Sequence, residues 1–230
     1  MKRDRAKDIL KTAAELIAEL QKDPAYNMRA RQREAEQRRN VDDYARAAAP
    51  LLQDLAAHGI QIKAVAELRS KRESFLTALP FLLKWLPVIT QPQVRSDLVN
   101  TLATPWASPV AAKPLIKEFK REAADSDESI RWAIGNALSF VADDSVREAV
   151  TDLVCDKRYG RSREMLAVAL ANMSPDRVFP ILVSLLDDEE LVGHAIIGLA
   201  KLKLPAARPY FQKYIDHPKQ WVREEAIRAL

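Results

Sequence analysis

The sequence has few of the residues that many fold classes and disulfide-bonded proteins need. Five glycines in 230 residues are too few for a turn-rich β fold, and no convincing run of alternating β-branched residues occurs. Cys155 is the single cysteine, so an intrachain disulfide is excluded and the chain can fold in a reducing cytoplasm, where we expect it. Because Asp152 and Asp156 disfavour a thiolate, we expect Cys155 to be a buried structural residue.

The motifs of common enzymes and metal sites are also missing. No P-loop, glycine-rich dinucleotide motif or nucleophile elbow occurs, and the three histidines show no zinc-site spacing with cysteine or carboxylates. No apolar run reaches the length of a membrane span, and the charged N-terminus lacks the apolar core of a signal peptide. These absences favour a non-enzymatic protein without a cofactor or metal, and they leave the enzyme question open.

Alanine, leucine, glutamate, lysine and arginine dominate the sequence, and these residues favour helix. We therefore predict an all-α protein. The formal charge of +4 is uneven: residues 1–90 carry 17 basic against 12 acidic side chains, and residues 91–230 carry 19 against 20. This N-terminal excess is a weak indication of a nucleic-acid partner.

Residues 1–72 are predicted to form a helical N-terminal cap. Asp4–Lys22 has one apolar helical face, and Asp42–His58 has another that ends at Gly59. Between them, residues 29–40 are rich in arginine and nearly devoid of large apolar side chains. We interpret this stretch as a solvated helix with Glu–Arg pairs, the alternative being a basic arm for phosphate or an acidic partner.

A helical pattern recurs five times in the rest of the chain, about 30 residues apart. Its first apolar position falls at Val94, Ile130, Ser162, Leu191 and Val222. A leucine follows eight residues later, at Leu102, Leu138, Leu170, Leu199 and Leu230, and a small residue or threonine precedes each leucine. The small side chain would let neighbouring helices approach, and the leucine would fill the layer behind it.

A first helix precedes each of these five, and in four of them it is marked by a proline followed by apolar residues, at Pro80, Pro114, Pro180 and Pro209. Earlier prolines at Pro109, Pro175 and Pro205 are predicted to start their helices, so the later proline would bend the helix. Two helices per period of about 30 residues predict an α-solenoid. The predicted repeats of residues 73–230 span 73–104, 109–142, 145–173, 175–203 and 205–230. The segment around Pro50 resembles a degenerate earlier copy.

The segments Trp221–Leu230 and Ile130–Leu138 carry a resemblance to HEAT repeats, specifically the short bacterial kind first noted in phycobilisome lyases. The resemblance covers about residues 73–230 and implies a right-handed superhelix whose second helices line a concave face. Val192 in place of arginine, Ser162 at an apolar position and a middle repeat without proline depart from the pattern. The resemblance implies no particular activity.

Four of the five copies have arginine at their second position: Arg95, Arg131, Arg163 and Arg223. In HEAT repeats this arginine usually ties neighbouring units together through loop carboxylates, so we interpret the four as structural. Asp127 and Asp216 lie shortly before two of them. A basic loop of Lys157, Arg158, Arg161 and Arg163 around Tyr159 has two interpretations, a solvated turn or a site for phosphate or a carboxylate-rich partner.

The positions left over on the second helices are mostly uncharged, which suits a protein or peptide better than nucleic acid. The predicted groove residues are Trp132, Asn100, Asn136, Val168, Ile197 and Arg228. The competing interpretation is that Val168 and Ile197 only pack against neighbouring helices.

The leading hypothesis is thus a non-enzymatic scaffold that binds protein or peptide. The alternative is nucleic-acid binding, as in alkylpurine DNA glycosylases with HEAT-like repeats, although the Trp-Trp-Asp segment expected of them is missing. A bilin-lyase-like enzyme is a third hypothesis. The C-terminal helix ends within its apolar pattern, so we expect its face to be covered by a second copy in a homodimer, by the partner, or by further residues.

Overall fold

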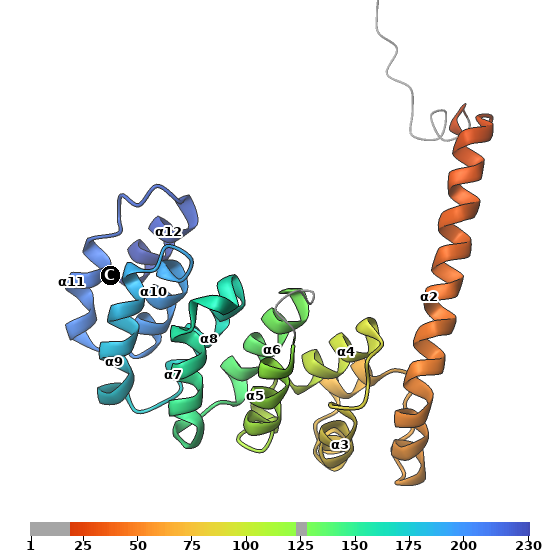
Figure 1. The fold of residues 1–230 in the computed structure, drawn as a ribbon, viewed down its shortest axis with the longest axis horizontal. Coiled ribbons are helices and arrows are strands. Elements are labelled where there is room, and N and C mark those ends of the chain that lie inside the picture. The colour runs from red at the N-terminus through yellow and green to blue at the C-terminus, as the bar shows by residue number, and fades with distance from the viewer. Residues whose placement is uncertain (1–18, 123–127) are drawn as a thin grey trace, which may run out of the picture. The chain divides into compact units, whose positions relative to one another are not determined.

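The computed structural model describes residues 19–122 and 128–230, and in these residues the protein is all-α, with helices and no strand (Figure 1). This confirms the predicted fold class. The chain divides into two compact units, Met1–Arg46 and Ala47–Leu230. The helix predicted over Asp4–Lys22 lies almost entirely outside the described residues.

In the first unit, the described residues belong mainly to helix α2 (Pro24–Ala57). The two segments predicted as separate helices, 29–40 and Asp42–His58, form this one continuous helix. Asp23 accepts a hydrogen bond from the backbone N–H of Ala25 at 2.8 Å, as expected at a helix start. All side chains from Arg31 to Asp43 are exposed, and Arg38 pairs with Glu34 one turn away. The stretch has the surface of a solvated helix.

In the second unit, the end of α2 packs with the repeats. Leu51 and Leu55 are fully buried, and Asp54 accepts hydrogen bonds from Lys84 Nζ at 2.7 Å and Trp85 Nε1 at 2.8 Å. Gly59, at φ +83°, ends the helix as predicted. The compact unit begins at Ala47, because the last turns of α2 bury an apolar face that residues 29–40 lack.

From α3 onward, first and second helices alternate along the second unit. The first helices are α3 (Arg72–Trp85), α5 (Ala112–Arg121), α7 (Arg147–Cys155), α9 (Pro175–Ser184) and α11 (Arg208–Gln212). The second helices are α4 (Pro92–Leu102), α6 (Glu128–Val141), α8 (Glu164–Leu170), α10 (Val192–Lys201) and α12 (Gln220–Ala229). Short 3₁₀ segments complete the unit: η1 (Val65–Ser70), η2 (Pro105–Ala107), η3 (Asp144–Val146), η4 (Lys157–Arg163), η5 (Leu185–Asp187) and η6 (Pro205–Ala207).

Each second helix packs against the next one along the chain: α4 against α6, α6 against α8, α8 against α10 and α10 against α12. The helices α6, α8, α10 and α12 also pack against the first helix of their own pair. Figure 1 shows these pairs following one another in chain order. This packing is compatible with the predicted solenoid.

The predicted leucine register marks the core. Leu102, Leu138, Leu170 and Leu199 are fully buried, whereas Leu230 is 40% exposed. The small residue before the leucine permits a close approach at Gly198, where a Cβ atom would lie 2.9 Å from the carbonyl oxygen of Ala167 on α8. The spacing of apolar and small residues thus sets the helix stacking.

Two details of the repeats differ from expectation. Pro175 starts α9 as predicted and Pro180 lies inside it, but α5 and α11 start later than predicted. Pro114 and Pro209 therefore lie in first helical turns, where a proline has no hydrogen bond to lose and does not bend the helix. The third second helix, α8, is short because Gly160 adopts φ +49° and the preceding segment becomes η4.

Truncating the leucine register should destabilise the protein. We expect Leu170→Ala to lower the free energy of unfolding by about 2–5 kcal/mol, because it leaves a cavity between helix layers. Leu76→Ala on α3 is the matched control, since Leu76 is 47% exposed. Denaturant titration measures both, and equal losses would contradict the assigned register.

Candidate binding groove

Two of the four repeat arginines join neighbouring repeats through carboxylates. Arg95 on α4 lies 2.9 Å from Glu118 on α5, whose side chain is 2% exposed. Burial raises the pKa of Glu118, although Arg121 and Arg95 oppose this shift. Arg163, with a side chain 2% exposed, pairs with Asp188 at 2.9 Å and Glu190 at 2.7 Å in the following repeat. These arginines are structural and do not form an anion site.

The other two arginines use different partners. Arg131 donates to the carbonyl of Glu122 at 2.6 Å and lies over the ring of Tyr159 in the next repeat, 5.4 Å from its centroid. Arg223 donates to the carbonyls of His217 at 2.7 Å and Pro218 at 3.0 Å. Within the described residues Arg223 pairs with no carboxylate, Asp216 included, and Asp127 lies outside those residues.

The basic loop, Lys157–Arg163, is largely neutralised. Arg158 binds both carboxylate oxygens of Asp156, and Arg161 lies 2.9 Å from Glu164. Arg163 is buried in the ion pairs just described. An exposed anion would therefore compete with existing carboxylates for Arg158 and Arg161 and could not reach Arg163, whereas Lys157 is exposed and forms no ion pair within the described residues.

Cys155 is exposed, so the prediction of a buried cysteine is wrong. It ends α7, beside the turn into η4, where the chain leaves the core. The pKa of its thiol is raised, first by partial desolvation and then by the charge of Asp152. A protonated thiol is a poor nucleophile.

A cavity of about 550 Å³ opens along the second helices, and we call it the groove cavity. Its lining includes Asn136 and Phe140 of α6, Met165 and Val168 of α8, Asn172 just beyond α8, and Lys201 at the end of α10. Asn136 and Val168 are two of the predicted groove residues. Val168 is only 7% exposed, so it packs against neighbours as well as contributing to the wall.

The remaining predicted groove residues lie outside this cavity. Asn100 is exposed on α4 and donates to Ser96 Oγ at 3.2 Å. Ile197 is half-buried on α10, and Arg228 is exposed on α12 and pairs with Glu225 at 2.7 Å. The structure thus places the predicted residues along several second helices without bringing them into one site.

The sequence analysis missed Phe140, Asn172 and Lys201. Each stands ten residues after the first apolar position of its repeat, at Ile130, Ser162 and Leu191. The predicted groove residues lie at most nine residues after the first apolar position. The tenth position falls near or beyond the end of its helix. The same repeat register, extended by one residue, would have found all three.

Hydrogen bonds fix the polar side of the groove cavity. Asn172 Nδ2 donates to the carbonyl of Ser139 at 2.7 Å, and Lys201 Nζ lies 3.5 Å from Asn172 Oδ1. Burial lowers the pKa of Lys201. The amide of Asn172 is therefore oriented by α6 and presents its oxygen to the cation at the end of α10.

Trp132 belongs to a separate cluster that runs from α6 to α12. Its Nε1 donates to Glu164 Oε2 at 3.1 Å, and Glu164 is 7% exposed. His194 Nε2 lies 3.9 Å from the same oxygen, and the His194 and Trp221 ring centroids are 5.4 Å apart. Trp132 is 40% exposed, so it is both a contact between repeats and a potential anchor for a partner.

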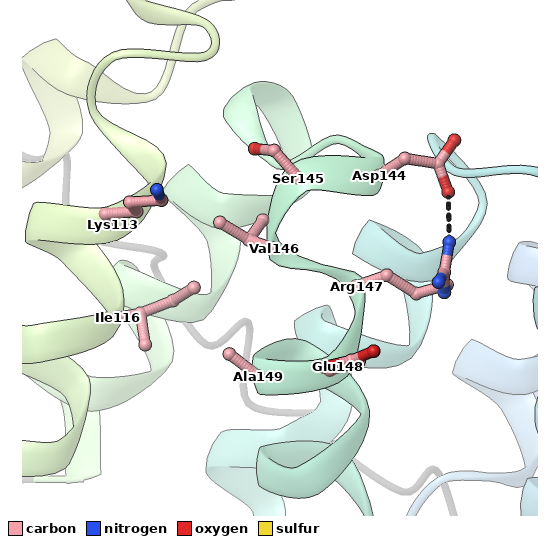
Figure 2. Close-up of a pocket in the computed structure, with 8 residues that line it drawn as sticks. All are labelled: Lys113, Ile116, Asp144, Ser145, Val146, Arg147, Glu148 and Ala149. Atoms are coloured by element: carbon pink, nitrogen blue, oxygen red, sulfur yellow. Dashed lines mark hydrogen bonds and ion pairs between the residues drawn. The ribbon is translucent and has the colours of Figure 1, made fainter.

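A second pocket, of about 350 Å³, lies between α5 and the start of α7 (Figure 2). Lys113 and Ile116 extend into it from α5, opposite Val146 and Ala149. Its carboxylate Asp144 binds Arg147 at 2.9 Å, and also the backbone and hydroxyl of the serine before α9. These bonds lower the pKa of Asp144 and tie the third repeat to the fourth.

The described part of the chain contains no group of three His, Cys, Asp or Glu side chains placed to hold a metal ion. Among the same residues, no helix combines the length and apolar character needed to cross a membrane. No protein-family model matches the chain, and no curated protein matches it. The resemblance to HEAT repeats therefore stays a prediction.

Removing a buried arginine should cost far more than removing an exposed one. Arg163→Ala leaves Asp188 without its partner, and we expect a loss of about 2–4 kcal/mol in the free energy of unfolding. Arg158→Ala, whose side chain is 87% exposed, should change stability little. Denaturant titration compares the two, and a tolerated Arg163→Ala would refute the structural role of the repeat arginines.

His194 should make the protein less stable in mild acid. Burial lowers the pKa of His194, against the attraction of Glu164, so the unfolded chain binds a proton more readily than the folded one. The contribution of His194 to the free energy of unfolding is therefore fully present above the ordinary histidine pKa of about 6.5. It is lost as the pH falls from there toward the folded-state pKa. Unfolding titrations at several pH values should show a shallower decline for His194→Gln, and an identical decline in wild type and variant would contradict this.

Proposed function

We propose that this chain is a non-enzymatic HEAT-like scaffold that binds another protein or peptide along its second helices. The observation that supports this best is the composition of the groove cavity. An exposed aromatic ring, Phe140, and the apolar side chains of Met165 and Val168 adjoin two amides and one lysine. Apolar contacts with a few fixed polar groups are typical of peptide recognition.

The distribution of charge supports protein over nucleic acid. A groove that binds a nucleic-acid backbone needs several unpaired lysine or arginine side chains, because contacts with the phosphates supply most of the affinity for nucleic acid. Arg158 and Arg161 of the basic loop pair with the flanking carboxylates of Asp156 and Glu164, and among the described residues Lys201 is the one basic side chain that lines the groove cavity. The basic residues of α2 are the remaining candidate for electrostatic attraction of an acidic partner.

Trp132 and the C-terminal helix extend the proposed surface. Trp132 is accessible near one end of α6, and Phe140 is accessible near the other. On α12, Ile227 is 60% exposed, which supports the predicted homodimer as a further proposal. These surfaces are compatible with binding either a partner protein or a second copy of the chain.

Photo-crosslinking from the groove tests the proposed function. A photoreactive phenylalanine analogue at Phe140 should capture a defined protein from cells of the source organism, and the same analogue at the exposed Leu76 should not. Val168→Asp or Trp132→Ala should weaken the purified complex by about tenfold or more if these residues are anchors. Capture that is identical from both positions would contradict a specific groove.

The nucleic-acid alternative is tested in parallel with single-stranded and duplex DNA at moderate salt. We expect no binding in the micromolar range. Micromolar binding that disappears in the Lys157/Arg158/Arg161→Gln variant would overturn the proposal and favour a nucleic-acid partner.

A further inference from the structure

Lys201 has an unusual position for a lysine at the edge of a cavity. Its nearest polar contact is the neutral Asn172 Oδ1 at 3.5 Å, and within the described residues no carboxylate lies within salt-bridge distance of it. An ammonium carries three donors, and this contact uses one of them weakly. The ammonium group of Lys201 is therefore available to an anionic group in the groove cavity.

The carboxylate that lines the same cavity does not fill this role. Asp143 accepts hydrogen bonds from the backbone N–H of Ser145 at 3.0 Å and from its hydroxyl at 2.5 Å, and so caps η3. It lies in the turn after α6, and Lys201 lies at the end of α10. In this cavity, Asp143 is therefore engaged in capping η3, and Lys201 has no carboxylate partner among the described residues.

Asn136 supplies a second group without a partner. It is half-buried in the wall of the groove cavity, and among the described residues its side-chain amide makes no hydrogen bond. An amide offers two donors and one acceptor, which match the carbonyl and N–H of a peptide unit. Asn172 cannot serve in the same way, because Ser139 already holds its Nδ2.

The third component is apolar. Phe140 is 45% exposed, and Met165 and Val168 line the cavity beside it. A volume of about 550 Å³ accommodates a large side chain together with its backbone. The groove cavity is therefore lined by an apolar wall, by the free amide of Asn136 and by the unpaired ammonium group of Lys201.

We propose that the groove cavity binds the C-terminal residue of a partner protein, with its carboxylate on Lys201, its last peptide unit on Asn136 and an apolar side chain against Phe140 and Val168. A chain terminus fits better than an internal acidic residue because it carries all three groups on one residue. An internal aspartate or glutamate would occupy the cation and leave the apolar wall to a neighbour. This inference rests on the proposed function and specifies the end of the partner that is recognised.

The test uses the full chain and peptides displayed with random, free C-termini. Selection should enrich peptides that end in a large apolar residue. A selected peptide is then synthesised as the free acid and as the C-terminal amide, and both are titrated by fluorescence anisotropy. The amide should bind about tenfold more weakly or worse, since a charge-assisted hydrogen bond is lost.

Variants then assign the effect to Lys201. Lys201→Met should weaken binding of the acid about tenfold and abolish the difference between acid and amide, and Lys201→Arg should preserve that difference. Asn136→Ala should weaken both peptides alike. Lys113→Met, the same change at another exposed lysine beside a pocket, should have no effect. Thermal melting confirms that each variant is folded.

The outcomes separate this inference from the proposed function. Equal binding of acid and amide, or selection of peptides by internal acidic residues, overturns the inference. Discrimination against the amide that survives Lys201→Met also overturns it. If no peptide binds while the crosslinker at Phe140 still captures a protein, the scaffold function stands and C-terminal recognition fails. If the crosslinker captures nothing as well, both fail.

Discussion

No helix pair in the repeat region can bury its apolar faces alone, and the rest of the structure depends on this constraint. Leu138 and Leu170 are fully buried because α6 and α8 each pack on both sides, against their own first helix and against the next second helix. Hydrophobic burial is non-directional, so it does not by itself set how one pair is placed on the next. The ion pairs of the buried arginines are directional, and they favour one placement of each helix pair on the next.

Arg163 illustrates how the direction arises. Arg163 lies at the end of η4 and pairs with Asp188 and Glu190 in the loop before α10. Arg95 on α4 pairs with Glu118 on α5. Each such pair would be costly if its partner were displaced, because a buried charge would remain. The apolar layers hold the repeats together, and the ion pairs penalise a shifted stacking.

The repeat register allowed much of the fold to be predicted from the sequence. The period of about 30 residues located the second helices, and the arginine at its second position indicated the ties between units. The compact unit starts at Ala47, where the apolar face predicted for Asp42–His58 buries Leu51 and Leu55. The short α8 was missed because a positive φ at Gly160 is not visible in a hydrophobic pattern.

The candidate site was predicted less well than the fold. Asn136 and Val168 were identified because they lie on helices, where the period fixes which face a residue occupies. Lys201 and Asn172 lie where their helices end, and their meeting depends on the packing of α10 on α8. Cys155 was assigned to the core from its acidic sequence neighbours, although it ends α7 at the surface. Residues at helix ends are thus the ones for which periodicity carries least information.

The packing of each second helix on its immediate neighbours also has a consequence for folding. Such contacts join residues about one repeat apart, so closing them costs little chain entropy at each step. Structure can begin in any interior pair and spread outward in both directions. Amide protons in α6 and α8, which have neighbours on both sides, should then exchange more slowly than those in α12, so that protection from solvent declines from the middle of the unit toward its end.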